Sequence, residues 1–281
     1  MSRTAALVAL HAAVALFGFA ALFGKWIALP PVVIVLGRTL IAAATLAAAL
    51  QIRRQPSIRP GFGLAANGAL LALHWVTFFA AVQLAGVAIA LLAFASFPVF
   101  VLAIESIERR RAPDRVEASA IALVIVGLAF LVPEFRWSSA ALQGHACGVI
   151  AGFTFAILTL RSRRAVTHYG AMNLALWQNA FAALCLVPFV AFDATSAMPS
   201  ERDLVLLLIL GVACTALAHT LFITSMRRVS AHTASVVSLL EPVYGIVLAA
   251  AFLGERPEAR TLLGMLLILA AALLATRHAN R

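Results

Sequence analysis

Apolar stretches long enough to cross a lipid bilayer fill most of this chain of 281 residues. Hydrophobic residues make up 63% of the chain and charged residues only 11%. A water-soluble domain could not cover that much apolar surface with so few charges, so the pattern predicts an all-α integral membrane protein with ten transmembrane helices. The ten stretches are 5–24, 32–50, 64–84, 86–107, 116–132, 142–160, 171–191, 204–225, 232–253 and 261–276.

The chain also repeats itself. Pro98 and Pro242 lie 144 residues apart, and each falls near the middle of a predicted span. With five spans in each half, the second copy must enter the membrane from the side opposite to the first. We therefore expect two inverted repeats, over residues 1–137 and 138–281, which is a layout typical of transporters.

The two prolines predict interruptions of their helices at membrane depth. Proline removes one backbone donor and displaces the carbonyl one turn earlier, and lipid offers that carbonyl no partner. In the functional interpretation, Pro98 and Pro242 are paired hinges that open a central cavity. In the alternative, each is a static kink that only shapes packing.

The basic residues predict how the chain is oriented. If the N-terminus is inside, 15 of them fall in cytoplasmic segments and five on the opposite side, while Arg38 lies within a span. This bias predicts a multi-pass protein of the cell inner (plasma) membrane with both termini in the cytoplasm. Because they come in short clusters between spans, the basic residues do not suggest a nucleic-acid partner. The cytoplasmic set is Arg3, Arg53, Arg54, Arg59, Arg109, Arg110, Arg111, Arg115, Arg161, Arg163, Arg164, Arg227, Arg228, Arg277 and Arg281, and the opposite set is Lys25, Arg136, Arg202, Arg256 and Arg260.

Several short motifs recur in a fixed order along the chain. They are Phe17-Gly18 and Gly152-Phe153 in the first span of each half, Arg38, Ser-Leu-Leu-Glu-Pro-Val-Tyr at 238–244, Leu-Gly-Glu-Arg-Pro at 253–257, and Gly264. Together they resemble the EamA family of the drug/metabolite transporter superfamily. The first half departs from the pattern, since it has the basic segment Glu108-Arg-Arg-Arg-Ala-Pro113 where the second half has Leu-Gly-Glu-Arg-Pro.

This resemblance implies ten helices in two inverted five-helix halves and a secondary transporter that exports small metabolites by alternating access. Amino acids are the substrates that it implies first. In length and aromatic content the chain is similar to YddG-type exporters of aromatic amino acids.

Two charged residues inside predicted spans are candidates for substrate binding. A carboxylate at the depth of Glu241 costs about 2.5–3.5 kcal/mol on insertion scales unless it is paired. It could bind a substrate ammonium or carry a proton, or it could instead bond backbone donors at the kink or pair with an arginine. Arg38 could hold a carboxylate through two parallel hydrogen bonds, or reach the headgroups or brace a neighbouring helix.

Histidines, aromatic residues and an amide at similar depth complete the predicted site. Histidine could bind a carboxylate or move protons, and aromatic rings suit an apolar or cationic side chain. Each of these residues also has an ordinary structural role as an alternative. The predicted substrate-binding residues are Arg38, His74, Trp75, Phe78, Phe79, Phe94, Trp177, Gln178, His219, Phe222, Glu241 and Tyr244.

The alternative function is a broad-specificity exporter of organic cations or drugs, in which Glu241 and the aromatic wall recognise the ligand. The sequence has no nucleophile–base, metal-ligand or phosphate-loop motif, so neither an enzyme nor a cofactor or metal is expected. The expected partners are an amino-acid-like small molecule and the lipid bilayer. We expect a monomer or a weak homodimer.

Overall fold

The computed structural model describes residues 1–108, 110, 112, 114–131, 139–191 and 198–278, and every regular element in these ranges is a helix. The predictions that involve Arg109, Arg111, Pro113, residue 132, Arg136, the boundary at residue 137 and Arg281 lie outside the described residues. The elements are α1 (Arg3–Trp26), α2 (Pro31–Ile52), α3 (Phe62–Ala85), α4 (Val87–Phe94), α5 (Phe97–Glu108), α6 (Arg115–Leu131), α7 (Ala140–Tyr169), α8 (Ala171–Ala191), α9 (Glu201–Gly211), the π-helix η1 (Val212–Leu217), α10 (Ala218–Ser225), α11 (Ala231–Ser238), α12 (Leu240–Leu253) and α13 (Ala259–His278).

Many of these helices could cross a membrane. In the described part of the chain, seven helical spans are long and apolar enough to do so, and three further apolar helices are shorter. The predicted all-α membrane fold is therefore confirmed, whereas the count of ten spans stays a prediction. The seven spans are Arg3–Trp26, Pro31–Ile52, Phe62–Ala85, Val87–Glu108, Ala140–Tyr169, Ala171–Ala191 and Glu201–Ser225, and the shorter helices are Ile121–Phe130, Leu240–Leu253 and Ala259–Ala271.

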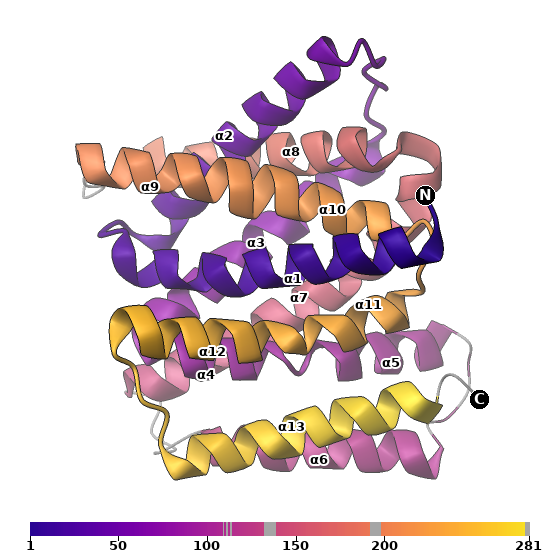
Figure 1. The fold of residues 1–281 in the computed structure, drawn as a ribbon, viewed down its shortest axis with the longest axis vertical. Coiled ribbons are helices and arrows are strands. Elements are labelled where there is room, and N and C mark those ends of the chain that lie inside the picture. Colours follow the sequence, from indigo (N-terminus) through magenta and orange to yellow (C-terminus); the bar gives the residue numbers. More distant parts are fainter. Residues whose placement is uncertain (109, 111, 113, 132–138, 192–197, 279–281) are drawn as a thin grey trace.

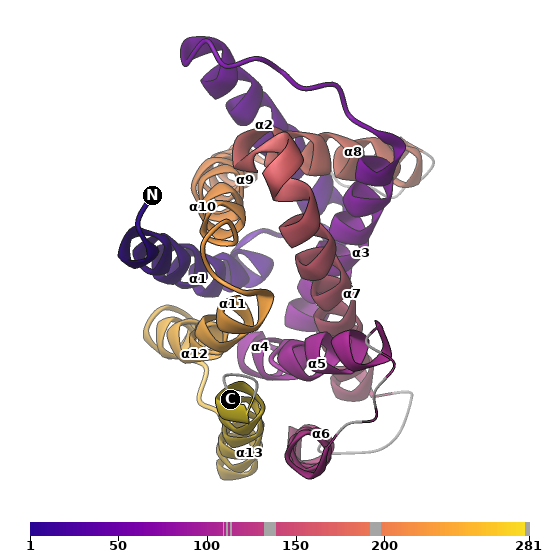
Figure 2. The same cartoon turned by 90° about the vertical axis from the view of Figure 1, so that its right-hand side faces the viewer.

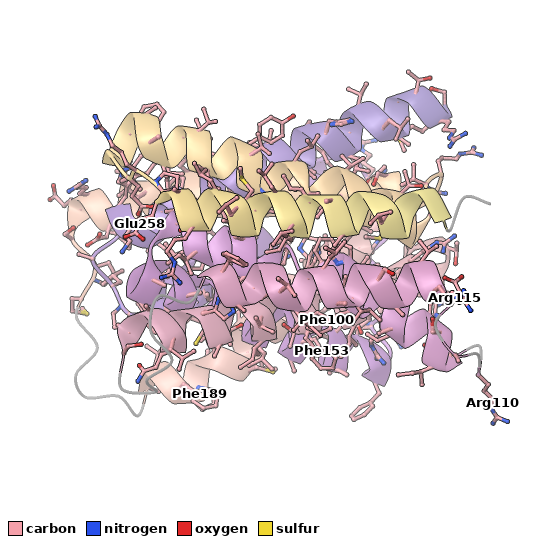
Figure 3. All side chains as sticks on the ribbon, turned by 90° about the horizontal axis from the view of Figure 1, so that it is seen from below. Phe100, Arg110, Arg115, Phe153, Phe189 and Glu258 are labelled. Carbon is pink, nitrogen blue, oxygen red and sulfur yellow. The ribbon has the colours of Figure 1, made fainter. Side chains whose placement is uncertain are left out.

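The helices form one bundle, in which the start of α1 and the end of α13 lie at the same end (Figure 1). α6 and α13 lie side by side at one edge of the bundle (Figures 1 and 2). The lack of a side chain at Gly127 of α6 lets the two helices pack closely. A Cβ added there would lie only 3.0 Å from the carbonyl oxygen of Gly264 in α13. Figure 3 shows Arg110 and Arg115 at one end of this pair and Glu258 at the other, so the two helices run antiparallel.

α7 extends beyond the apolar stretch that predicted it. The stretch ends at residue 160, but the helix continues to Tyr169 through a polar segment that begins at Arg161. Arginine and alanine favour helices, and the segment contains neither glycine nor proline. The helix ends where Gly170 adopts a positive φ of 70°.

Both predicted helix interruptions are present. Ala95 and Ser96 separate α4 from α5, and Pro98 lies in the first turn of α5. Leu239 separates α11 from α12, and Pro242 lies in the first turn of α12. Proline is tolerated there because the N–H groups of a first turn have no partner within the helix. Bending of the protein at these breaks stays a prediction.

Each break is covered by a glycine from the other half of the chain. A Cβ added at Gly18 of α1 would lie 3.0 Å from the carbonyl oxygen of Glu241, and one added at Gly152 of α7 would lie 3.0 Å from the carbonyl oxygen of Phe94. A larger residue at either position would force the neighbouring backbone to shift. The first helix of each half therefore packs on the broken helix of the other half, and the two halves interlock.

A second contact between the halves involves Glu255 of the Leu-Gly-Glu-Arg-Pro motif. Its two carboxylate oxygens accept hydrogen bonds from the N–H of Val87 at 3.1 and 3.3 Å. Val87 begins α4, directly after Gly86 with its positive φ of 87°. The first N–H groups of a helix have no partner within it, and its dipole favours a negative charge there. Glu255 thus caps the helix that leads to the first break.

We predict that Glu255→Ala destabilises the protein by about 1 kcal/mol, the usual loss when a helix cap is removed. Glu255→Gln should lose less, because its amide oxygen still accepts a hydrogen bond. Glu258→Ala is the matched control, since this exposed residue belongs to the same connection and its side chain makes no hydrogen bond among the described residues. Thermal unfolding of detergent-purified protein measures the effect. Equal midpoints for Glu255→Ala and Glu258→Ala would contradict the capping role.

Candidate functional site

A buried arginine, Arg38 of α2, lies at the centre of the bundle and is only 1% exposed. Its Nε donates to Thr215 Oγ1 at 2.9 Å, and its Nη2 donates to the carbonyl oxygen of Cys214 at 3.3 Å. The guanidinium carbon lies 3.9 Å from the centroid of the Trp75 ring, a close cation–π contact. Among the described residues, no carboxylate lies within ion-pair distance of Arg38. The site therefore contains a buried positive charge without a counter-ion from the protein.

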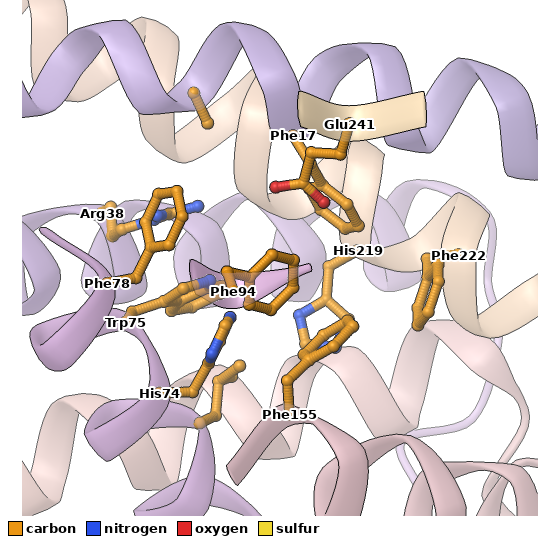
Figure 4. Close-up of a pocket in the computed structure, with 12 residues that line it drawn as sticks. Phe17, Arg38, His74, Trp75, Phe78, Phe94, Phe155, His219, Phe222 and Glu241 are labelled. Carbon is orange, nitrogen blue, oxygen red and sulfur yellow. The ribbon is translucent and has the colours of Figure 1, made fainter. Parts of the chain in front are cut away.

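Glu241 contributes the opposite charge to the same region. It lies in the first turn of α12, directly after the second helix break, and is 5% exposed. Figure 4 shows its carboxylate pointing into the pocket that Arg38 also lines. Within the ranges described, this carboxylate has neither a hydrogen-bond donor nor an arginine as partner. The structure therefore does not show the backbone bonds or arginine pair that were the structural alternative for Glu241.

Two histidines add polar groups to the pocket. His74 Nδ1 of α3 lies 3.0 Å from the carbonyl oxygen of Ala151. Because a carbonyl oxygen only accepts, we assign the proton to Nδ1, which leaves Nε2 of the neutral ring as an acceptor. His219 of α10 contacts the Trp75 ring edge-on, with ring centroids 5.7 Å apart. No group of three His, Cys, Asp or Glu residues that could bind a metal occurs in the described part of the chain.

Phenylalanines from both halves of the chain form a continuous wall. The centroid of the Phe94 ring lies 5.8 Å from that of Phe78 and 5.4 Å from that of Phe155. The Phe222 ring continues this series, with centroids 5.5 Å from Phe155 and 5.7 Å from Phe17. Phe78 and Phe222 are equivalent residues of the repeat, 144 positions apart. The wall can therefore accept an apolar or aromatic group by stacking or edge contact.

These residues enclose a cavity of about 30 Å³. A space of this size has room for about two water molecules, so a larger ligand can enter only if side chains or helices move. With a cation, a carboxylate and an aromatic wall, the pocket is suited chemically to a small molecule that carries both charges and an apolar group. The lining residues are Phe17, Ala20, Arg38, Leu71, His74, Trp75, Phe78, Phe94, Phe155, His219, Phe222 and Glu241.

Most of the predicted binding residues line this pocket, namely Arg38, His74, Trp75, Phe78, Phe94, His219, Phe222 and Glu241. Phe79 and Tyr244 do not. Phe79 is fully buried behind the wall, where its ring centroid lies 5.3 Å from the guanidinium carbon of Arg38. Tyr244 packs against α1, and its Cβ would lie 3.0 Å from a Cβ added at Gly18. A role in binding for these two residues stays a prediction.

Trp177 and Gln178 of α8 do not line the pocket either, and their side-chain nitrogens bond to other parts of the protein. Trp177 Nε1 donates to the carbonyl oxygen of Ile58 at 2.8 Å, and Gln178 Nε2 donates to Ser162 Oγ at 2.8 Å. One turn before Trp177, Asn173 Oδ1 accepts from the N–H of Ile58 at 3.1 Å. Trp177 and Asn173 therefore hold the connection between α2 and α3 against α8.

The sequence did not predict Phe17, Ala20, Leu71 or Phe155 as substrate-binding residues, and Phe155 is the most informative of the four. The motif Gly152-Phe153 drew attention to Phe153, which is 45% exposed. Residues three apart in a helix share a face, and Gly152 is the residue that packs inward. Phe155 lies three positions after Gly152 and therefore faces the pocket. This spacing could have identified it.

Sequence comparison matches the chain to the EamA-like transporter family over residues 4–132 and 142–277. The two matched segments together cover most of the chain. Each contains one of the helix breaks and contributes residues to the pocket.

Individual relatives are similar over part of their length. An uncharacterized transporter, YxxF, of Bacillus subtilis (strain 168) is 27% identical over 209 residues, which cover 73% of this chain and 66% of that protein. An uncharacterized inner membrane transporter, YicL, of Salmonella typhimurium (strain LT2) is 26% identical over 66% of this chain and 62% of its own length. The threonine/homoserine exporter RhtA of Escherichia coli (strain K12) is 30% identical over 54% of this chain and 52% of its own length. The chain thus matches between about half and two thirds of these relatives.

A solved crystal structure has the same fold. It covers the whole of both chains with a TM-score of 0.74 at 20% sequence identity. At this identity the similarity concerns the fold alone.

Proposed function

The chain belongs to the EamA-like transporter family, and we propose that it exports amino acids with aromatic or hydrophobic side chains across the inner membrane by alternating access. The family and the relatives make it a multi-pass membrane transporter. The threonine/homoserine exporter RhtA is a relative whose named substrates are amino acids, which supports the substrate class.

One observation carries the proposal. Arg38 and Glu241 line the same pocket, both are almost fully buried, and neither has an oppositely charged partner among the described residues. A buried charge without a partner is costly, so a ligand that supplies both missing partners would bind strongly. A zwitterionic amino acid has this charge arrangement, and the aromatic wall provides a place for its side chain.

The atoms that remain available suggest a role for each residue. Arg38 would hold the carboxylate through two parallel hydrogen bonds, and Glu241 would bind the ammonium group. From the sequence, His74 was a candidate for the carboxylate alongside Arg38. Because its Nδ1 is used by Ala151, its free Nε2 is an acceptor, and we now place it with Glu241 near the ammonium.

The size of the cavity and the helix breaks support alternating access. A cavity of about 30 Å³ is too small for an amino acid. We propose that helices of the inverted halves 1–137 and 138–281 rearrange around the pocket and that the chain bends near Pro98 and Pro242. One chain supplies the whole pocket, so the transporter would work as a monomer or a weak homodimer, with α6 and α13 as a scaffold away from the substrate.

We predict that Arg38→Gln raises the half-saturating concentration of phenylalanine at least about tenfold, because hydrogen bonds to a charged group contribute about 1.5–3 kcal/mol. Uptake of labelled phenylalanine into proteoliposomes measures this. Arg53→Gln, which removes an exposed arginine just after the same helix, is the control and should behave as wild type. Unchanged half-saturation in a folded Arg38→Gln protein would refute the assigned role.

A broad-specificity exporter of organic cations is the alternative function. Glu241 and the phenylalanine wall support it, since a carboxylate and aromatic faces both attract cations. Glu241→Gln separates the two hypotheses in whole-cell export assays. Loss of both amino-acid and cation export fits the amino-acid proposal, whereas loss of cation export with intact amino-acid export favours the alternative.

The orientation in the membrane is also a proposal. The connection between α2 and α3 lies against the start of α8, where Asn173 Nδ2 donates to the carbonyl oxygen of Pro56 at 3.2 Å. This end of the bundle also holds the start of α1 and the end of α13 (Figure 1). Because the predicted cytoplasmic arginines flank these segments, we propose that this end faces the cytoplasm.

Side-specific cysteine labelling tests this orientation in a variant without Cys147, Cys185 and Cys214. In intact cells, a membrane-impermeant maleimide should label Glu258→Cys but neither Gln55→Cys nor Thr167→Cys. After the membrane is opened, all three should react. Labelling of Gln55→Cys and Thr167→Cys from different sides would exclude the inverted-repeat topology.

A further inference from the structure

We propose that Thr215, which does not line the pocket, orients Arg38 and so sets the preference of the transporter for ligands with a free carboxylate. This inference rests on the proposed export of amino acids. Thr215 lies in η1 and is 0% exposed. Its hydroxyl donates to the carbonyl oxygen of Leu210 at 2.7 Å, so its lone pairs face Arg38 and accept from Nε at 2.9 Å.

The π-helix provides a second acceptor for the same guanidinium. In a regular α-helix, the N–H of Ala218 would donate to the carbonyl of Cys214, four residues earlier. Here it donates to Ala213 and Thr215 instead. The Cys214 carbonyl therefore lacks its usual α-helical donor, and it accepts from Arg38 Nη2 at 3.3 Å. A π-helical turn inside a long helix is rare and is often found at functional sites.

These two bonds fix the direction of Arg38. A guanidinium has five N–H donors in one plane, and Thr215 and Cys214 use one edge of it, formed by Nε and Nη2. The Trp75 ring lies against its face at 3.9 Å. What remains is the end edge, formed by Nη1 and the second hydrogen of Nη2, and Figure 4 shows the guanidinium nitrogens directed toward the pocket. An edge of two parallel donors matches a carboxylate.

Removal of the Thr215 hydroxyl should loosen this arrangement without removing any charge. Valine has nearly the same shape as threonine but cannot accept from Nε, so Arg38 would have to turn toward another acceptor. Ligands with a carboxylate should lose affinity, while ligands that bind through their ammonium and ring should not. A change that only damaged packing would weaken both kinds of ligand equally.

The chain offers a matched control in Thr39, on the same helix as Arg38. It is also 0% exposed, and its hydroxyl donates to the carbonyl oxygens of Val35 and Leu36 rather than contacting Arg38. Thr39→Val therefore removes a buried threonine hydroxyl without touching the guanidinium. Thr215→Ser is the conservative variant, because it keeps the hydroxyl that accepts from Nε.

The experiment measures uptake of labelled phenylalanine into proteoliposomes and its inhibition by phenylalanine and by phenylalanine amide, which lacks the carboxylate. The preference for phenylalanine should fall about tenfold in Thr215→Val, the loss of one hydrogen bond to a charged group. It should stay within about twofold of wild type in Thr215→Ser and Thr39→Val. If Thr215→Val does not fold, Thr215→Ala replaces it.

An unchanged preference in folded Thr215→Val or Thr215→Ala would overturn the inference, and so would an equal loss in Thr215→Ser. If wild-type protein takes up phenylalanine but Thr215→Val, Thr215→Ser and Thr39→Val all have the same preference for phenylalanine over its amide, only the proposed role of Thr215 fails. If wild-type protein takes up no amino acid, the proposed function itself fails.

Discussion

The buried guanidinium of Arg38 is the interaction on which the rest of the site depends. An ion taken out of water costs roughly several kcal/mol even after the protein relaxes around it. Here the cost is offset by two hydrogen bonds that Arg38 donates to η1 and by contact with the face of Trp75, rather than by a carboxylate. The arrangement keeps Arg38 in place in the absence of a ligand and leaves its charge uncompensated. A ligand carboxylate can supply the missing charge.

The fold brings this charge together with Glu241 because the second helix break places Glu241 in the first turn of α12, where it lines the same pocket as Arg38. Pro98 and Pro242 each lie in the first turn after a break, and the glycines Gly18 and Gly152 let the other half of the chain pack against these breaks. As a result, residues from both halves share one pocket. Because helices pack mainly against helices of the other half, as α3 does on α7 and α6 on α13, any change in the shape of the pocket must rearrange contacts between the halves.

Much of this could be predicted from the sequence, because membrane spans and repeats leave strong patterns. The offset of 144 residues identified both helix breaks, and the repeat mates Phe78 and Phe222 both line the pocket. The pattern could not show where a polar side-chain group finds its partner, so Trp177 was predicted to face the substrate, but its indole N–H donates to Ile58 instead. Nor could it predict the contact of η1 with Arg38, a residue 177 positions from Thr215 along the chain.

The most direct test is a structure of the protein with bound para-bromophenylalanine, whose bromine can be located by anomalous scattering. The account predicts the ligand carboxylate about 2.7–2.9 Å from Nη1 and Nη2 of Arg38, with Nε still bonded to Thr215 and the brominated ring against Phe94, Phe155 and Phe222. A ligand whose carboxylate lies away from Arg38, or that binds outside this pocket, would contradict it.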